Sequence, residues 1–200
     1  MCGRYALHSN PDLIALQFGL ESPPDFKPSY NICPGTDILI IGMDGSADQC
    51  RWGSKLANAR GETVAEKPAF RDAFRRWRCL VPASGFYEWK CVAGKKHPWH
   101  MRPKDAGLFG LAGISGLWNG LHTVSLITTE PNALLRPIHH RMPVIIQPGD
   151  YAAWLDGKNR DIAALKDLLR PYPAERMQAY PVSLRVNTPQ NDDPALIAAI

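Results

Sequence analysis

The second residue of the chain is a candidate nucleophile. The sequence opens Met1-Cys2-Gly3-Arg4-Tyr5, so removal of Met1 would give Cys2 a free α-amine beside its thiol. The pKa of an α-amine is about 7.7–8.0 and that of a thiol about 8.5, so a fraction of each is in its nucleophilic form at neutral pH. Such a 1,2-aminothiol can attack an acyl carbon, with its amine as the base. It can also condense with an aldehyde and close a thiazolidine ring. From its position alone, Cys2 could take part in either reaction, and it could equally well have no chemical role.

Glu88 is a candidate for proton transfer. It lies among aromatic residues in Gly85-Phe86-Tyr87-Glu88-Trp89-Lys90. On a strand, its carboxylate either faces solvent or is partly desolvated, and desolvation would raise its pKa towards neutrality. The residues alone favour the solvent face.

Two polar loops could assist such chemistry. Residues 138–143 place His139, His140 and Arg141 before an apolar strand, and histidine is the side chain best suited to proton transfer near neutral pH. Residues 58–63 carry Asn58, which could orient a reacting group, and Arg60, whose planar donor fork fits a phosphate. Each loop taken singly is also compatible with an ordinary surface loop.

The distribution of charge indicates a polyanionic partner. The net charge of the 200 residues is +4, but residues 51–104 hold 13 Lys and Arg against four acids, and the rest holds 10 against 15. Four tryptophans lie in the basic segment, so aromatic faces are available for stacking on bases. For any single residue, a solvated basic face or a core tryptophan remains the alternative.

Composition argues against several other classes. The five cysteines include no CxxC pair, which favours a reducing compartment and argues against a structural zinc site, so we expect no metal. No segment resembles a signal peptide or a membrane span. With 45% apolar residues, the chain is expected to form one domain over residues 1–200.

The elements that would position these residues are short and separated by turns. Asn10 before Pro11 predicts a helix over 12–18 that stops at Gly19, and Asp44-Gly45 predicts a hairpin of 38–43 with 49–52. An amphipathic helix is predicted over 68–77, with Arg71, Arg75, Arg76 and Arg78 on its outer face. Further strands are expected at 79–81, 86–91, 98–102, 108–114, 123–128, 144–147 and 177–182, and further helices after Pro131, at 149–155 and at 160–169. This pattern is typical of an α+β fold with a mainly antiparallel, curled or barrel-like sheet and flanking helices.

Seven motifs taken together resemble the SRAP (SOS-response-associated peptidase) family of abasic-site-processing proteins. They follow the family's order and span nearly the whole chain. The matching segments are Met1-Cys2-Gly3-Arg4-Tyr5, Tyr30-Asn31-Ile32-Cys33-Pro34-Gly35, Arg51-Trp52-Gly53, Asn58-Ala59-Arg60-Gly61-Glu62-Thr63, residues 79–89, Ile138-His139-His140-Arg141-Met142-Pro143 and Pro181-Val182-Ser183.

The resemblance implies a reaction and a set of roles. Proteins of the family lose the initiator methionine, with self-cleavage as one route, and crosslink to abasic sites in single-stranded DNA through a thiazolidine, without metal or organic cofactor. By matching position, Cys2 would be the nucleophile, Asn58 would orient it, Glu88 would transfer protons and His139 would assist at the sugar and in reversal. Strand cleavage as a lyase is a further activity that the resemblance suggests.

The resemblance also implies DNA contacts. Arg4, Arg60 and Arg141 match backbone-binding arginines, and Thr128 matches a pocket position. Trp52 or Trp89 could stack on an exposed base. A monomer in the cytoplasm acting on chromosomal DNA is expected, or a nuclear protein in a eukaryote.

One segment departs from the family. Only residues 54–57 separate Gly53 from Asn58, where the family usually carries a longer, aromatic-containing loop that holds the DNA strands apart. The departure predicts that DNA is bound more weakly, or that other residues form the wedge that separates the strands.

Two alternatives remain at the level of sequence. A glutamine amidotransferase-like hydrolase also begins Met-Cys-Gly, although Arg4-Tyr5 departs from its usual start. A non-covalent single-stranded DNA-binding module with an inert cysteine is the other, and retention of Cys2, Asn58, Glu88 and His139 together argues against it.

Overall fold

The protein is described by a computed structural model that covers residues 2–53, 55–105, 107–118 and 120–200. The predictions about removal of Met1, and the part of the shortened segment at Ser54, therefore lie outside the described residues. Thirteen strands, four α-helices and four 3-10 helices are assigned within these ranges. No helix in these ranges is long and apolar enough to cross a membrane.

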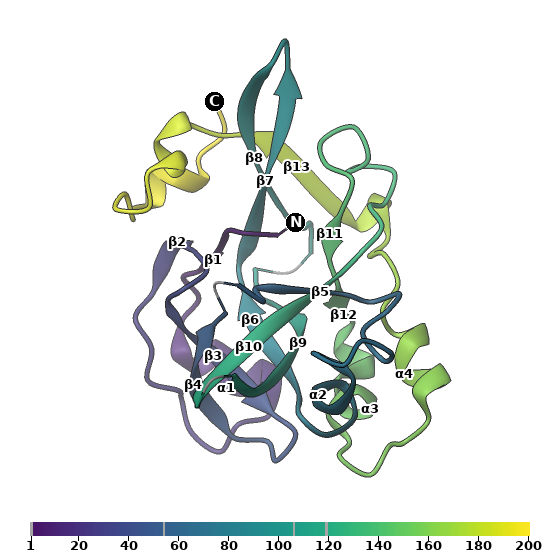
Figure 1. Ribbon diagram of the computed structural model, residues 1–200. Coiled ribbons are helices and arrows are strands. Elements are labelled where there is room, and N and C mark those ends of the chain that lie inside the picture. The colour runs from purple at the N-terminus through teal and green to yellow at the C-terminus, as the bar shows by residue number, and fades with distance from the viewer. Residues whose placement is uncertain (1, 54, 106, 119) are drawn as a thin grey trace.

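The strands form two sheets (Figure 1). One has the order β13-β8-β7-β1-β2. In the other, β10 pairs with β4 and also with β9, so that β10, β4, β3, β6 and β9 close into a ring. The bounds of the strands are β1 Tyr5–Leu7, β2 Ser29–Ile32, β3 Asp37–Gly42, β4 Ala47–Trp52, β5 Asn58–Arg60, β6 Arg78–Ala83, β7 Gly85–Val92, β8 Lys95–Pro103, β9 Phe109–Trp118, β10 Leu121–Thr129, β11 Met142–Pro143, β12 Ile145–Ile146 and β13 Met177–Pro181.

The pairing is mainly antiparallel, as predicted. Among the named strand pairs, only β10 with β4 and β10 with β5 are parallel. The ring of strands confirms the predicted α+β fold with a barrel-like sheet. Its strand β6 is buried at every position, because it lies between β3 and β9 with apolar side chains of the core on both faces.

The helices lie outside the ring and are short. Their bounds are α1 Pro11–Phe18, α2 Arg71–Arg76, α3 Tyr151–Leu155 and α4 Ile162–Asp167, with 3-10 helices η1 Pro148–Asp150, η2 Ala174–Arg176, η3 Leu184–Asn187 and η4 Pro194–Ile197. Helix α1 is as predicted: the Asn10 side chain accepts from the Asp12 amide at 2.8 Å, and Gly19 ends the helix at φ 67°. A left-handed residue at this position favours glycine, because it has no Cβ.

Three sequence predictions are wrong in detail. Helix α2 is shorter than residues 68–77. The short helix predicted directly after Pro131 is absent, because residues 133–138 form turns instead. These turns are stabilised by the Asn132 side chain, which accepts from the Leu135 amide at 3.0 Å and donates to the Tyr172 carbonyl at 2.7 Å. Arg78 does not lie on the outer face of a helix, because it begins β6 and is 1% exposed.

The buried Arg78 joins the ends of two helices. Its guanidinium donates to the carbonyl of Phe74 at 2.9 Å, to that of Trp154 at 2.7 Å and to that of Asp156 at 2.7 Å. The carbonyls at a helix C-terminus have no partner within the helix, so a buried cation there satisfies several acceptors at once.

We expect Arg78→Met to destabilise the fold by about 3 kcal/mol, because it leaves buried carbonyl oxygens without donors. Urea unfolding followed by tryptophan fluorescence would measure the change. The matched control is Arg76→Met on the exposed side of α2, for which a change within about 0.5 kcal/mol is expected. Equal stability of the two variants would contradict this account of Arg78.

Candidate functional site

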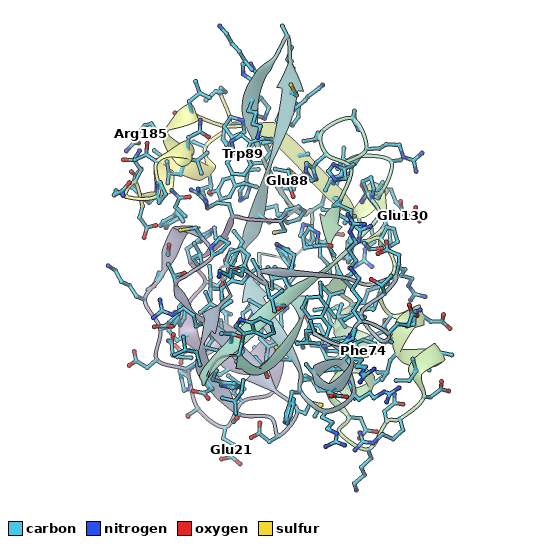
Figure 2. All side chains as sticks on the ribbon, in the orientation of Figure 1. Glu21, Phe74, Glu88, Trp89, Glu130 and Arg185 are labelled. Atoms are coloured by element: carbon cyan, nitrogen blue, oxygen red, sulfur yellow. The ribbon has the colours of Figure 1, made fainter. Side chains whose placement is uncertain are left out.

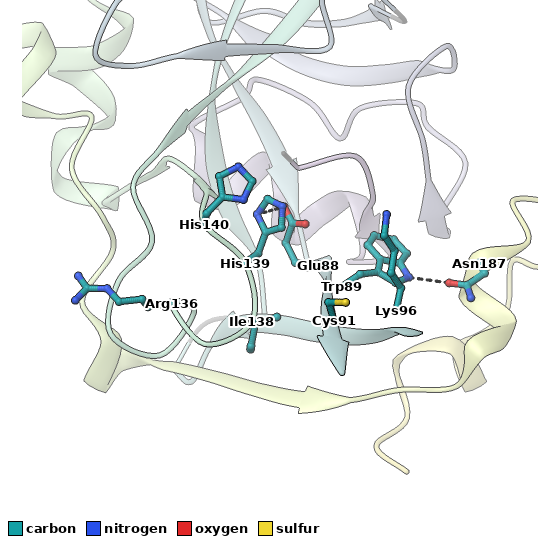
Figure 3. Close-up of a pocket in the computed structure, with 9 residues that line it drawn as sticks. All are labelled: Glu88, Trp89, Cys91, Lys96, Arg136, Ile138, His139, His140 and Asn187. Atoms are coloured by element: carbon teal, nitrogen blue, oxygen red, sulfur yellow. Dashed lines mark hydrogen bonds and ion pairs between the residues drawn. The ribbon is translucent and has the colours of Figure 1, made fainter. Parts of the chain in front are cut away.

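A cavity of about 710 Å³ lies between the β7–β8 hairpin, the loop before β11 and the segment after β13 (Figure 3). Strand β7 contributes Glu88 and Trp89, and the loop before β11 contributes His139. Figure 2 shows Glu88 and Trp89 beside β7 in the upper half of the molecule. The remaining lining residues are Cys91, Lys96, Arg136, Ile138, His140 and Asn187.

Cys2 is completely buried and lies near enough to Glu88, which lines the cavity, for their charges to interact. The Asn58 side-chain amide donates to the Cys2 carbonyl at 2.9 Å, and the Cys2 thiol is 4.0 Å from the Arg4 carbonyl. Asn58 begins β5, whose parallel pairing with β10 brings it to this point. Burial raises the pKa of the Cys2 thiol far above its ordinary value, and the nearby negative charge of Glu88 adds to the shift. Cys2 is therefore held by Asn58 and kept as a thiol while it is buried.

Glu88 and His139 form a pair. The Glu88 Oε1 and His139 Nδ1 atoms are 3.6 Å apart, and the Glu88 side chain is 4% exposed (Figure 3). Burial raises the pKa of Glu88 from 4.5 to about 7. Burial also lowers the pKa of His139, so the neutral imidazole is favoured. A carboxyl group that titrates near pH 7, beside a neutral imidazole, can donate a proton to a reacting sugar or accept one from it.

The expectation that Glu88 faces solvent is wrong. Successive residues of a strand point to opposite faces. Phe86, on the same face as Glu88, lies in the core cluster that contains Cys2, while Tyr87, on the other face, packs against Val182, Val186 and Leu196 of the C-terminal segment. Over residues 85–88, strand β7 is thus covered on both faces, and the carboxylate is buried at the edge of the cavity rather than on an open solvent face.

The Arg141 side chain is held by two residues, Thr128 and Glu62. Its guanidinium donates to the Thr128 carbonyl at 2.7 Å and, through two nitrogens, to both oxygens of Glu62 at 2.6 and 2.9 Å. The Arg141 guanidinium holds the pKa of Glu62 below its usual range. Thr128 is buried and Arg60, beside it on β5, is exposed. The structure brings these three predicted residues together, with the Glu62 carboxylate paired to Arg141.

Arg4 and Trp89 are neighbours. The guanidinium carbon of Arg4 lies 5.8 Å from the centre of the Trp89 ring, and its Nη1 donates to the Asn31 side chain at 2.6 Å. The Trp89 indole donates to the Asn187 side chain at 2.7 Å (Figure 3). Trp89 is partly exposed and lines the cavity. It therefore has a fixed orientation and an accessible face.

Trp52 cannot stack on a base as the sequence suggested. It is 0% exposed, its ring meets Tyr5 edge-on at 5.5 Å, and its indole donates to the Ala57 carbonyl at 2.9 Å. These contacts make Trp52 a core residue that holds the chain just before Asn58.

Sequence reasoning missed several residues of the cavity. Asn187, Lys96 and Arg136 contribute polar groups, and the rings of His139 and His140 are 4.3 Å apart. No local signal identified Asn187, because its contact with Trp89 joins residues 98 positions apart. Among the described residues, no group of three or more His, Cys, Asp or Glu could hold a metal ion.

Comparison with known proteins gives consistent matches. The family description "SOS response associated peptidase (SRAP)" matches residues 1–189. The chain is 42% identical to "Abasic site processing protein YoqW" of Bacillus subtilis (strain 168), covering 98% of this chain and 99% of that one. It is 26% identical to "Abasic site processing protein YedK" of Escherichia coli (strain K12), over the full length of both.

Solved structures agree. The crystal structure of a Bacteroides thetaiotaomicron protein superposes with a TM-score of 0.90 at 26% identity, covering 100% of both chains. A Bordetella bronchiseptica protein superposes with a TM-score of 0.78 at 26% identity, covering 92% of this chain and 100% of that one. With the family match over nearly the whole chain, these findings show that the chain belongs to the SOS response associated peptidase (SRAP) family.

Proposed function

We propose that the protein captures abasic sites in single-stranded DNA by forming a thiazolidine between Cys2 and the open-chain sugar aldehyde, and so shields the lesion. The observation that carries the proposal is that Asn58 holds Cys2 by its backbone, within electrostatic reach of the buried Glu88–His139 pair. Membership of the family, and the names of its relatives as abasic site processing proteins, support this reading.

The reaction needs proton transfer and no cofactor. After loss of Met1, the Cys2 amine adds to the aldehyde carbon and the carbinolamine loses one water to form an imine. The thiol then adds to the imine carbon, and its proton passes to the nitrogen as the five-membered ring closes. Opening of the sugar ring, loss of water and ring closure each move a proton, which Glu88 and His139 can donate or accept. Lyase-like strand cleavage from the imine, and autocatalytic removal of Met1, are finer parts of the same proposal.

The surrounding cations suit the DNA backbone. Arg60 is exposed beside Thr128, and Arg141 would exchange its bonds to Glu62 for bonds to a phosphate. A bidentate phosphate contact has the geometry that the arginine fork already makes with the carboxylate. Trp89, partly exposed and oriented by Asn187, supplies the stacking face for a base near the lesion.

The decisive experiment is an intact mass measurement of purified protein before and after incubation with an abasic single-stranded oligonucleotide. The expected result is protein that lacks Met1, followed by an adduct of protein plus oligonucleotide minus one water. The adduct should survive denaturation. Glutaminase activity without an adduct would favour the amidotransferase alternative, and salt-sensitive binding without an adduct would favour the non-covalent module.

We further expect the protein to form one domain over residues 1–200 and to be a monomer. We expect it to act on chromosomal DNA in the cytoplasm, or in the nucleus of a eukaryote. Light scattering coupled to size-exclusion chromatography would test the monomer.

A further inference from the structure

A second cavity, of about 410 Å³, lies at the opposite end of β10 from Thr128. It is lined by Trp118 and Leu121, which lie opposite each other in the β9–β10 ladder and so share one face. Trp118 is 43% exposed and Leu121 is 63% exposed. The other described lining residues are Gly35, Arg51, Gly53, Lys55, Leu56 and Thr123.

The charge of this groove is positive. Arg51 and Lys55 are the charged residues among its described lining, and both are exposed. Arg51 also contacts Asp37 at 2.9 Å, an ion pair that is about half exposed on both sides and is therefore readily exchanged for a phosphate. A small hollow that shares Trp118 and Leu56 with this groove is also lined by Ala73 of α2, whose Arg71, Arg75 and Arg76 are exposed.

Exposed aromatic and apolar side chains beside cations are what a single nucleic-acid strand requires, because bases stack on the ring while phosphates contact the cations. Strand β10 links this groove with the candidate site: its first residues pair with β4, and its last residues pair with β5 and β11 (Figure 1). Residues 121 and 128 are separated by seven positions, or about 23 Å along a strand. Several nucleotides beyond a lesion would be needed to reach the groove.

We infer that the groove formed by Trp118, Leu121 and Lys55 is a second subsite, which binds an unpaired base and phosphate of single-stranded DNA several nucleotides away from the abasic site. The inference rests on the proposed function and adds that tight binding requires a DNA strand long enough to reach the groove. A second copy of this chain is a less suitable occupant. In a two-fold contact through this face, each copy would present the same positively charged surface to the other, and like charges disfavour association.

The experiment compares binding of three undamaged single-stranded oligonucleotides. One has about four nucleotides, and the other two carry in addition a tail of about ten nucleotides, on the 5′ side in one and on the 3′ side in the other. Fluorescence anisotropy at fixed salt gives the affinities. The wild-type protein should bind one of the two tailed probes more tightly than the other. Trp118→Ala should weaken binding of that probe by about tenfold, the loss expected for one base–aromatic stack. Binding of the short probe should not change. Trp118→Tyr should restore most of the affinity, and Lys55→Ala should reduce the salt dependence of tailed binding.

The matched control is Trp77→Ala, which removes another exposed tryptophan (51%) that lies outside the groove. The inference is overturned if Trp118→Ala leaves tailed binding unchanged, or weakens binding of the short and the tailed probes equally. It is also overturned if light scattering shows a dimer that Trp118→Ala dissociates, since the occupant is then a second copy. Because the probes are undamaged, their binding does not require the crosslink. If no adduct formed with abasic DNA, the proposed function would be refuted, but the effect of the tail on affinity would still stand as a separate result.

Discussion

Cys2→Ala is expected to abolish the denaturation-resistant adduct, reducing its yield to background. The thiazolidine requires an amine and a thiol on adjacent carbons, and alanine at position 2 keeps only the amine. Cys2→Ser separates imine formation from ring closure. The serine amine can still form an imine, which borohydride would reduce to a stable amine, but without a thiol it cannot close a thiazolidine. Denaturing gels with a labelled abasic oligonucleotide, and intact mass, provide the measurement.

The chain offers a close control for this substitution. Cys91 is also a free cysteine, and it is exposed and lines the cavity that contains Glu88. Its backbone nitrogen is in a peptide bond, so it has no free α-amine and cannot close the ring. We therefore expect Cys91→Ala to retain the wild-type adduct yield. An adduct that persists in Cys2→Ala and disappears in Cys91→Ala would reverse the assignment of the nucleophile.

Local signals in the sequence predicted those parts of the fold that local contacts determine. The cap at Asn10 and the stop at Gly19 define α1 without help from the rest of the chain. The Asp44-Gly45 turn likewise identifies the β3–β4 hairpin, whose strands pair from Asp37 with Arg51 to Ile41 with Ala47. In both cases the information lies within a few residues of the element.

Strands that depend on distant partners were missed. Strand β1 has three residues and lies between β7 and β2, while β5 has three residues and pairs with β10, more than 60 positions away. Neither has a periodic pattern of its own. These two strands nevertheless bring Cys2 and Asn58 to the candidate site, so the sequence named the residues without predicting how they meet.

Burial was the other property that local patterns could not give. The solvent-face expectation for Glu88 assumed a strand with one face in water, but the C-terminal segment covers the second face of β7. Trp52 was expected near DNA because it lies in a basic segment, whereas the closed ring of strands places it in the core. In both cases the covering residues are remote in sequence. The neighbouring aromatic residues were therefore compatible with either environment.

Burial of Glu88 has a consequence for stability as well as for chemistry. A carboxyl group whose pKa is about 7 in the folded protein and about 4.5 unfolded binds its proton more tightly when folded. The folded state is therefore favoured fully below pH 4.5, and this contribution is lost as the pH rises to about 7. Above that range, the ionised carboxylate destabilises the fold by about 3 kcal/mol relative to a neutral group of the same shape. Glu88→Gln should thus be at least as stable as wild type at pH 8, and thermal unfolding at pH 4 and pH 8 would measure the difference.

Glu88→Gln is expected to slow crosslinking by about 10²- to 10⁴-fold, the range typical of losing a general acid–base group. The amide keeps the size of the side chain but cannot exchange a proton. Single-turnover crosslinking rates against pH should show an inflection near 7 in the wild type that is absent in the variant, while the inflection of the terminal amine near ~8 remains in both. The control is Glu66→Gln, an exposed carboxylate paired with Lys166, which should retain the wild-type rate and profile. Wild-type rates in Glu88→Gln, for both formation and reversal of the adduct, would show that the carboxylate is structural. Because the variant is expected to be no less stable than the wild type at pH 8, a loss of rate there would reflect the missing proton transfer.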